Sequence, residues 1–405
     1  MSNAPSVGLE EATPRPRPEP RASSQSHLRD AAATLVPPLL VYALANLVLW
    51  VAAMQQRLDY WAPSTRSRWD SAWYFEIAER GTHLVRCASA PGRPLDAWCG
   101  SAGWFPGYPA LIWVLDRFGL QSDLAGTLIS EAFVLLLLVL IWKGFLLSTP
   151  AFSGHLSRLL ALLLAGFWFG QVFYHAVFPM APCAFFLLLT LLCLRRRWWL
   201  RAGLAGAAAA TLYPSGVFVA LAAAIWICLP FTRLGWRSRL SGLSLGAGLP
   251  AAGLFAVLAY QRYATGHWTA YLDAKASYGV GVNLPWDSLA WHVHFWLRWG
   301  PRDLMAAPAG QALLVAALTL VALLTLPLLW RKDVELGTLL AAALLVYWLS
   351  PLVLGRLSLY RADSLLLPGA ILLGRLPAPV VAIVLAAAVA LSYATGVLFF
   401  ANLLA

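Results

Sequence analysis

Long apolar runs, separated by short polar segments, make up most of the chain after residue 30. Each of the longest runs is close to the roughly 20 residues that a helix needs to cross a bilayer. The pattern therefore predicts an all-α, polytopic membrane protein. The full-length runs lie at 31–53, 123–146, 156–172, 177–194, 241–260, 309–330, 336–354 and 378–402.

Other apolar stretches are shorter or interrupted. Residues 203–212 and 215–230 are divided by TLYPSG, and residues 365–374 read LLLPGAILLG. The stretch WFPGYPALIWVL, residues 104–115, is about half a span long and contains two prolines. Broken helices persist in a bilayer only where protein or a polar cavity satisfies the freed backbone groups. We therefore expect broken helices here, and a re-entrant or surface-lying helix at 104–115.

Composition and charge add an orientation to this picture. Of the 405 residues, 60% are hydrophobic and only 12% are charged, and the formal net charge is +11. Basic residues cluster at the ends of spans, in RRRWWLR (195–201), TRLGWRSR (232–239) and RK (331–332). Cytoplasmic loops carry an excess of Lys and Arg, so these ends and the N-terminus are predicted to be cytoplasmic. Nucleic-acid binding explains this charge less well.

The domain organisation follows from the same pattern. Residues 1–30 are rich in Pro, Ser and Arg and are predicted to be a disordered cytosolic tail. Residues 31–405 are predicted to form one transmembrane domain, with two large external loops at 54–122 and 261–308. Cys87 and Cys99 lie in the first of these loops. A disulfide between them is possible on that side of a membrane, but sequence spacing cannot give the geometry, so the question stays open.

The segment SRWDSAWYFEIAERG, residues 67–81, places an acid among aromatic residues just after the first span. In a helix, Asp70, Trp73, Tyr74 and Ile77 share one face. A partly desolvated carboxylate would have a raised pKa, which would make Asp70 a better general base. The plainer interpretation is an amphipathic interfacial helix with a solvated acid. Composition alone favours that plainer interpretation.

Other candidate residues lie in segments predicted to be external. The rigid GWFPGYP carries Trp104 and Tyr108, which could stack on a sugar or an isoprenoid chain, or could belong to an aromatic belt. The cations of the outer loops could hold a phosphate or could simply reach the membrane surface. Arg361 and Asp363 are stronger candidates, because charge near membrane depth points to function. No metal site is predicted, since the paired histidines of the second loop do not have a zinc-site spacing.

Several motifs, in order along the chain, resemble the GPI mannosyltransferase II (PIG-V-like) family and its bacterial relatives, which are GT-C glycosyltransferases. That family shows Arg-Trp-Asp, an aromatic stretch and Ile-Ala-x-x-Gly after the first span, and this chain has RWDSAWYFEIAERG. Its Phe-Pro-x-Tyr-Pro segment is matched by WFPGYP. Two later segments, YATGHWTAYLDAKASYG and YRADSLLLPG, are similar to family patterns in a weaker way.

The resemblance implies about ten spans, with short interfacial helices in a large first external loop. It implies an integral-membrane enzyme that moves a hexose such as mannose from a polyprenyl-phosphate carrier to an acceptor hydroxyl. The short chain, rich in Ala, Leu and Arg and without an organelle signal, suggests a bacterial inner membrane. The acceptor would be a glycan, a glycolipid or a protein, and no cofactor beyond the lipid-linked donor is implied. Asp70 would be the general base. The predicted substrate-binding residues are Arg68, Trp69, Trp73, Tyr74, Trp104, Tyr108, His175, Tyr213, His267, Lys275, Arg361 and Asp363.

The chain departs from the family pattern at two positions. Met180 stands in FPMAP where the family commonly has Glu, and Tyr213 stands in LYPSG where it often has Arg. These changes could mean a different sugar or acceptor, or a non-catalytic subunit that needs a partner. The broken helices leave a third hypothesis open, a transporter or lipid flippase.

Overall fold

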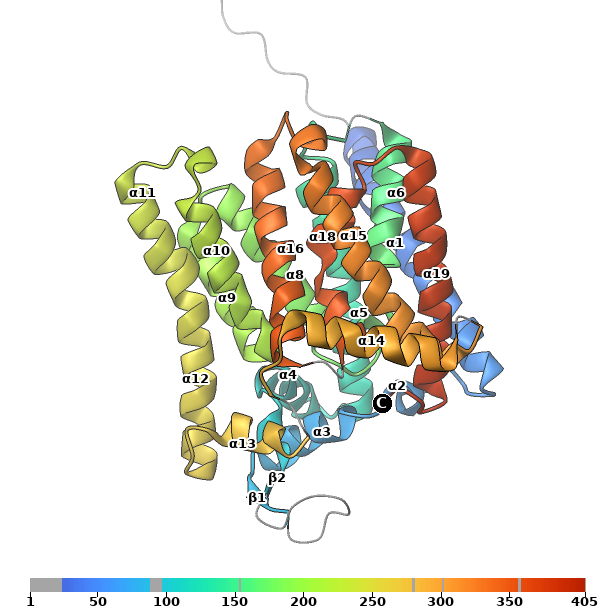
Figure 1. Cartoon of the computed structure of the whole chain (residues 1–405), viewed down its shortest axis with the longest axis vertical. Coiled ribbons are helices and arrows are strands. Elements are labelled where there is room, and N and C mark those ends of the chain that lie inside the picture. The colour runs from blue at the N-terminus through green and yellow to red at the C-terminus, as the bar shows by residue number, and fades with distance from the viewer. Residues whose placement is uncertain are drawn as a thin grey trace, which may run out of the picture.

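The computed structural model describes residues 24–87, 97–152, 154–278, 281–300, 302–355 and 358–404. In this part of the chain, the structure is helical apart from one two-stranded antiparallel sheet (Figure 1). Most of the predicted tail lies outside the described residues, and residues 24–30 form the start of the first helix. The all-helical prediction is therefore confirmed, with a small hairpin added.

Six helical segments are long and apolar enough to cross a membrane among the described residues. The prediction of a polytopic, integral membrane protein is therefore confirmed at this level. The runs predicted at 156–172 and 177–194 form shorter helices, and so do the pieces on either side of TLYPSG. The six segments are Ala33–Gln55, Ser122–Leu146, Trp236–Thr265, Leu304–Leu329, Val334–Leu354 and Ala378–Phe400.

The first half of the chain begins with α1 and then forms a group of short elements. The elements of this group are α2 (Pro63–Arg66), α3 (Ser71–Arg80), β1 (Val85–Arg86), β2 (Trp98–Cys99), η1 (Ser101–Gly103) and α4 (Gly107–Asp116). The helices of the bundle in this half are α1 (Ser24–Gln55), α5 (Ser122–Ile141) with its extension η2 (Trp142–Leu146), α6 (His155–Gly166), α7 (Val172–His175), α8 (Met180–Arg195) and α9 (Trp199–Leu212).

The second half continues the bundle and ends with α19. Its first elements are η3 (Pro214–Val217), α10 (Phe218–Cys228), η4 (Pro230–Thr232), α11 (Trp236–Ser241), η5 (Gly242–Ala247), α12 (Gly248–Thr265) and α13 (Ala270–Ala276). The remaining elements are α14 (Pro285–Trp299), η6 (Leu304–Ala306), α15 (Ala307–Leu329), α16 (Val334–Leu354), α17 (Leu359–Ala362), η7 (Asp363–Leu365), α18 (Leu367–Leu373) and α19 (Ala378–Phe400). Helix α14 lies across the others (Figure 1).

The break between α9 and α10 is a close-packed turn. Pro214 begins η3, because proline lacks the N–H that a continuous helix would need there. A Cβ on Gly216 would lie 2.0 Å from the carbonyl oxygen of Ala209, and one on Gly107 would lie 2.5 Å from that of Thr211. Only glycine permits these approaches. The end of α9 is thereby fixed against α4, and Tyr213 stands at the break.

The two ends of the bundle differ in character. At one end, Arg195 donates to Asp333 at 2.7 Å, and Arg197 lies 3.7 Å from Glu335. Trp142 donates to the carbonyl of Ala33 at that end, which places the start of the first candidate span there too. The elements α3, α4, α13 and the hairpin gather at the opposite end (Figure 1). The basic clusters of the sequence thus share one end of the molecule.

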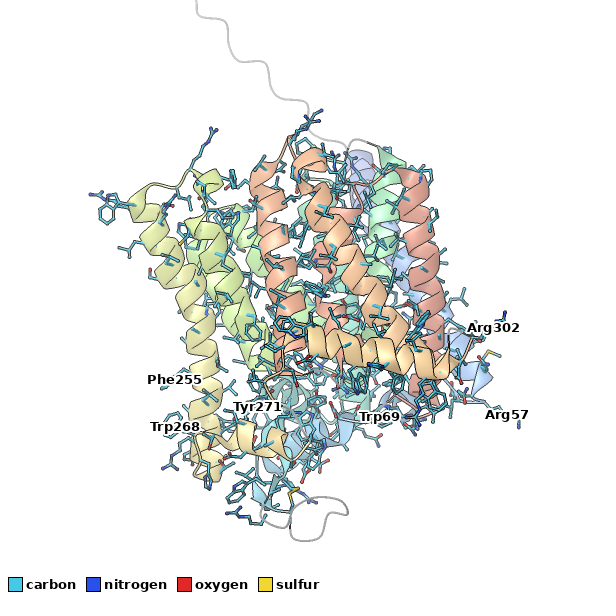
Figure 2. The ribbon with its side chains drawn as sticks, in the orientation of Figure 1. Arg57, Trp69, Phe255, Trp268, Tyr271 and Arg302 are labelled. Carbon is cyan, nitrogen blue, oxygen red and sulfur yellow. A yellow bond between two sulfur atoms is a disulfide. The ribbon has the colours of Figure 1, made fainter. Side chains whose placement is uncertain are left out.

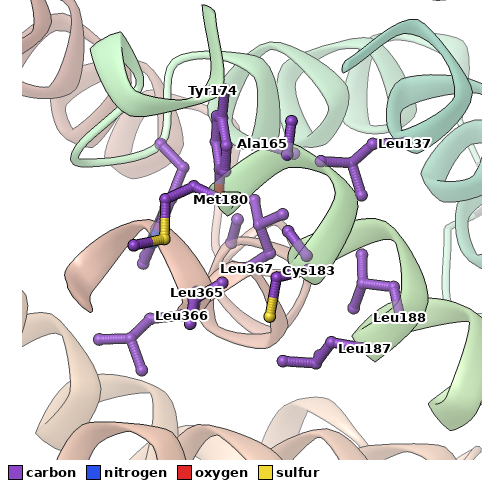
Figure 3. Close-up of a cluster of buried hydrophobic side chains, with 14 of the residues drawn as sticks. Leu137, Ala165, Tyr174, Met180, Cys183, Leu187, Leu188, Leu365, Leu366 and Leu367 are labelled. Carbon is purple, nitrogen blue, oxygen red and sulfur yellow. The ribbon is translucent and has the colours of Figure 1, made fainter. Parts of the chain in front are cut away.

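Between these ends lies a continuous apolar core. Figure 3 shows part of it, where side chains of α8 lie beside residues 365–367. Met180 is completely buried in this cluster, beside Tyr174 and Cys183. Met180, the position at which the family that the motifs resemble has an acid, is therefore part of the apolar core in this chain.

Candidate active site

A cavity of about 400 Å³ lies at the end of the bundle opposite the basic loops. Its wall is made by segments far apart in sequence: α3 and η1, the break between α9 and α10, α12, α13, the end of α16, and α17. Three charged side chains line it, namely Asp70, Lys275 and Arg361. Figure 2 shows Tyr271, which also lines the cavity, on α13 at this end of the molecule.

Asp70 is brought to the cavity by an unusual backbone turn. Trp69, just before it, has a left-handed conformation with φ of 55°, which is rare for a bulky residue. Backbone strain of this kind tends to cluster at functional sites. Asp70 then stands at the N-cap position of α3, but its side chain does not cap the helix. Ser71 holds the start of α3, since its hydroxyl lies 2.8 Å from the carbonyl oxygen of Arg68. The carboxylate is thus left available to other groups.

Arg361, on α17, forms an ion pair with Asp70 through its Nη1 atom. The exposed fractions of the two side chains are only 15% and 19%, so little water screens the pair. The Nε atom of Arg361 is buried and has no hydrogen-bond partner among the described residues. The Nε–H of Arg361 can therefore donate a hydrogen bond to an anion bound at the cavity wall.

The pKa of Asp70 shifts in the direction opposite to the prediction. Burial by itself would raise the pKa of this carboxyl, as expected from its aromatic neighbours. The nearby charges of Arg361 and Lys275 outweigh burial and hold the pKa below its usual value. The sequence could not show these two cations beside Asp70, which is why the prediction of a raised pKa was wrong.

Lys275 has the opposite environment. Burial and the charge of Arg361 lower the pKa of its ammonium to about 8, against the attraction of Asp70. Its Nζ atom lies 4.2 Å from the ring centre of Trp104, which gives a cation–π contact. Lys275 is therefore a cation that can lose its proton within the physiological range.

Aromatic rings surround the charged groups. Trp73 stacks on Trp104 with ring centres 4.7 Å apart, and Tyr278 meets Trp104 edge-on at 5.7 Å. The indole N–H of Trp104 is buried beside Asp70, and its interaction with the carboxylate helps to lower the pKa of Asp70.

One side of the cavity is apolar. Leu254 and Leu258 on α12, Phe218 on α10 and Leu354 on α16 line this side. Because α12 and α16 are both candidate membrane spans, this wall lies next to the part of the bundle that would face lipid. The cavity therefore has one side lined by charged and aromatic residues and another side lined by apolar residues.

The structure brings together about half of the residues predicted from sequence. Those that line the cavity are Asp70, Tyr74, Trp104, Tyr213, Lys275 and Arg361. Trp73 touches this group through its stack on Trp104. Tyr213 reaches the cavity because the helix break exposes it there. Two residues depart from the pattern of the family that the motifs resemble. Tyr213 lies in the cavity wall, and Met180 lies in the core.

The other predicted residues point elsewhere. Tyr108 is buried between α4 and α5, where its hydroxyl donates to the carbonyl of Gly126 at 2.9 Å. Asp363 is buried against Gln311, whose amide lies 3.0 Å from its carboxyl. His175 bonds to Glu131 in the core, at 3.1 Å from both carboxyl oxygens.

Three further predicted residues lie at the surface of this end or near it. The ring of His267 packs on Trp98 of the hairpin, with centres 5.0 Å apart. Arg68 bonds to the backbone of Thr65, and the side chain of Trp69 is exposed, as Figure 2 shows. None of these three lines the cavity.

Several cavity residues were missed from the sequence. Tyr271 precedes Lys275 by four positions, so a shared helix face could have indicated it. Ser215, Asn283, Ser350 and Ser358 are small polar residues of the kind common in loops, and the sequence carried no signal for them. The core pair of His175 was also missed, although Glu131 is an acid within an apolar run.

The open question of the first loop is settled by a Cys87–Cys99 disulfide with a Cα–Cα distance of 5.2 Å. It joins the two strands of the β1–β2 hairpin; β2 packs on α13, and its Trp98 also lies against His267, just before α13. α13 carries Tyr271 and Lys275. The disulfide therefore stabilises the part of the structure on which one wall of the cavity rests.

Among the described residues, no group of three or more His, Cys, Asp or Glu side chains is arranged to hold a metal ion. The chain matches no protein-family model, and no curated protein is similar to it at a significant level. The cavity itself is therefore the feature from which a function can be inferred. Its groups can bind one anion between two cations and place a carboxylate beside it.

Proposed function

We propose that this protein is an integral-membrane glycosyltransferase that moves a hexose, with mannose as the first candidate, from a polyprenyl-phosphate donor to an acceptor hydroxyl. One observation carries the proposal. A cavity with an apolar wall contains a partly buried carboxylate, Asp70, beside two partly buried cations, Arg361 and Lys275. A lipid-linked phosphodiester has the same division into a hydrocarbon chain, one negative charge and a sugar.

In this proposal each group has a distinct task. The donor phosphate lies between Arg361 and Lys275, and the prenyl chain runs along Leu254 and Leu258. Asp70 takes the proton of the acceptor hydroxyl as that oxygen forms a bond to the anomeric carbon. The bond from the anomeric carbon to the phosphate oxygen breaks, and the phosphate leaves with the electron pair. The two cations stabilise the charge of the leaving phosphate.

The charge balance supports a singly charged donor phosphate. Two cations and one carboxylate leave a surplus of one positive charge among side chains that are largely shielded from solvent. A phosphodiester neutralises that surplus, and burial makes an uncompensated charge costly. The low pKa of Asp70 is compatible with this task, because the carboxylate is always ionised near neutral pH and is ready to accept a proton.

The resemblance to GT-C enzymes supports a bundle of about ten spans, with α6, α8 and the α9–α10 pair as shorter crossings beside the six long segments. The grouping of Arg195, Arg197 and the RK pair at one end supports a cytoplasmic location for that end and for the N-terminus. The cavity would then face the extracytoplasmic side of a bacterial inner membrane, where lipid-linked sugars serve as donors.

The test is sugar transfer by purified protein in vesicles that contain polyprenyl-phosphate mannose and a candidate acceptor lipid. Asp70→Asn should reduce transfer by about 10²- to 10⁴-fold, the range for loss of a general base. Asp333→Asn is the matched control, because it removes the same charge from an arginine pair at the other end of the bundle. Full transfer by a folded Asp70→Asn protein would overturn the role of Asp70.

One observation favours a second candidate, a transporter of a lipid or sugar. The helix break at Tyr213 lies in the cavity wall, and broken helices at binding sites are frequent in transporters. Movement of the lipid-linked sugar across the vesicle membrane without any transfer product would favour this function over the enzyme.

A further inference from the structure

A second buried group of charges lies apart from the cavity. Glu131, on α5, pairs with Arg66 at the end of α2, and both of its carboxyl oxygens lie 3.1 Å from Nδ1 of His175. The exposed fractions of these side chains are 13%, 4% and 2%, in that order. None of the three lines the cavity. The proposed reaction makes no use of them so far.

Such a group is costly to bury. Glu131 lies within the candidate span Ser122–Leu146, where a charge needs a partner and marks function more often than it marks packing. A fully apolar cluster at this position would be as stable or more so, because burial removes charged groups from water. The ion pair therefore calls for a reason beyond stability.

The contacts around Glu131 connect it to residues 66–71, the segment that carries Asp70. The carbonyl oxygen of Arg66 accepts from the backbone N–H of Val177 at 3.1 Å. The carbonyl oxygen of Val177 lies 3.1 Å from the hydroxyl of Ser71, which is buried. Residues 66 and 71 are thus both tied to Val177, two positions after His175. Glu131 joins the two sides of this link, since it holds Arg66 on one side and His175 on the other.

Arg66 itself is tightly held. Its Nε atom donates to the carbonyl of Tyr60 at 3.2 Å, and its guanidinium lies 4.2 Å from the centre of the Tyr60 ring. Residues 67–70, with the left-handed turn at Trp69, run between the fixed points at 66 and 71. A short segment between two fixed ends has little freedom, which is how a strained turn can persist.

We propose that Glu131 is a positioning residue: through Arg66 and His175 it holds segment 66–71 so that Asp70 faces Arg361 and the donor phosphate. This inference rests on the proposed function of Asp70. Glu131 does not touch the substrate. Its effect is geometric, and a displacement of a reacting group by about 1 Å can cost on the order of 100-fold in rate.

The experiment compares Glu131→Gln with Asp333→Asn in full-length protein reconstituted in vesicles. Both changes remove one carboxylate charge from a buried or partly buried arginine pair, and Asn still caps α16. Hydrogen–deuterium exchange measured by mass spectrometry follows the amides of Ser71 and Val177, both of which are hydrogen-bonded. Transfer is measured per folded molecule as kcat and as KM for polyprenyl-phosphate mannose.

We expect these amides to exchange at least about tenfold faster in Glu131→Gln, and at the original rate in Asp333→Asn. We expect kcat to fall by about 10- to 100-fold in Glu131→Gln while the donor KM changes less than about threefold. If Glu131→Gln does not fold, His175→Phe removes one arm of the link and leaves the Arg66 pair. It should speed exchange at Val177 and lower kcat by a smaller factor.

Unchanged exchange at Ser71 and Val177 would overturn the inference, whatever the activity. Faster exchange with full kcat would also overturn it, provided that Asp70→Asn is inactive in the same assay. If Asp70→Asn transfers sugar normally, Asp70 is not the base although the protein is a transferase, and the exchange rates alone then decide whether Glu131 holds the segment.

Discussion

Two arginine–carboxylate pairs at opposite ends of the bundle show how similar contacts can differ in meaning. Arg361 and Asp70 meet at the wall of a cavity, beside a second cation, Lys275. Arg195 and Asp333 meet at the basic end, where Asp333 also caps α16 and Arg195 also bonds to Thr149. The exposed fractions of the two pairs are similar, at 15% and 19% against 20% and 12%.

Burial alone therefore does not distinguish them. In the Arg195–Asp333 pair, each side chain has a second hydrogen bond, Arg195 to Thr149 and Asp333 to the backbone N–H of Leu336. At the cavity, one positive charge is left over, and the Nε donor of Arg361 is unpaired among the described residues. The two pairs therefore differ in what remains unpaired. The Arg195–Asp333 pair stabilises the fold, whereas the Arg361–Asp70 pair, with a spare donor and a surplus positive charge beside a cavity, can bind an anion.

The largest expected effect is a difference in sugar transfer between variants of Arg361 and of Arg195. Arg361→Gln should lower transfer by about 10²- to 10³-fold, as for loss of one donor to a developing negative charge. Arg195→Gln should leave transfer per folded molecule unchanged and lower only thermal stability. Initial rates in vesicles, together with melting temperatures, check both. Similar losses of transfer in the two variants would remove the distinction between the two ends.

A smaller effect concerns the surplus charge on Lys275, whose pKa is about 8. If its positive charge holds the donor phosphate, kcat/KM should fall as pH rises above about 8, since the free enzyme loses that proton. Lys275→Arg should extend the active range to higher pH, because an arginine stays protonated. Lys275→Met should be about tenfold slower at pH 7 and flat across this range. A wild-type profile that does not fall would exclude Lys275 from the phosphate site.

Lys275 should also affect stability in a defined direction. Its pKa is lower in the folded protein than in the unfolded chain, so the unfolded chain binds more protons between pH 8 and the usual value of 10.5. The contribution of Lys275 to the free energy of unfolding therefore rises with pH across that window. Lys275→Met should lose this part of the pH dependence, which chemical unfolding at several pH values would show.

The smallest expected effect is that of the disulfide. Replacing Cys87 and Cys99 with serine should lower the stability of the first loop by about 2–3 kcal/mol, from the added freedom of the unfolded chain. We expect only a two- to threefold loss of transfer, because the hairpin supports α13 without lining the cavity. Melting and transfer measured with and without reductant check this, and a complete loss of transfer would assign the hairpin a direct role.

Much of the fold could be predicted from hydropathy. A bilayer sets the length of a span, so runs such as 123–146 and 378–402 correspond closely to helices Ser122–Ile141 and Ala378–Phe400. The hairpin could not be predicted in the same way, because its strands are two residues long and carry no alternating pattern. The helix break at Tyr213 was indicated by the proline and glycine that follow it.

The sequence indicated which residues were candidates for the site. It indicated much less about which of them lie together in space. Asp70 and Arg361 are 291 positions apart, and only the topology of the bundle brings them together. Tyr108 and Asp363 were chosen for their residue type and neighbouring motifs, yet both face the core. In helices that are apolar on all sides, periodicity does not tell which face meets a cavity. The order of the motifs indicated which end of the molecule contains the site. Which side chains line the cavity depends on helix packing, which the sequence did not show.

The pair between Asp70 and Arg361 also gives the proposed reaction a sequence of steps. With no donor bound, the arginine that would hold the phosphate is occupied by the carboxylate that would accept the proton. An arriving phosphate competes for that guanidinium and leaves Asp70 with less positive charge around it, which makes it a stronger base. The enzyme would then be unable to activate an acceptor until its donor is in place. Ordered kinetics, with the lipid-linked sugar binding first, would be the signature, and wasteful hydrolysis of the donor by water would be limited to the interval before the acceptor arrives.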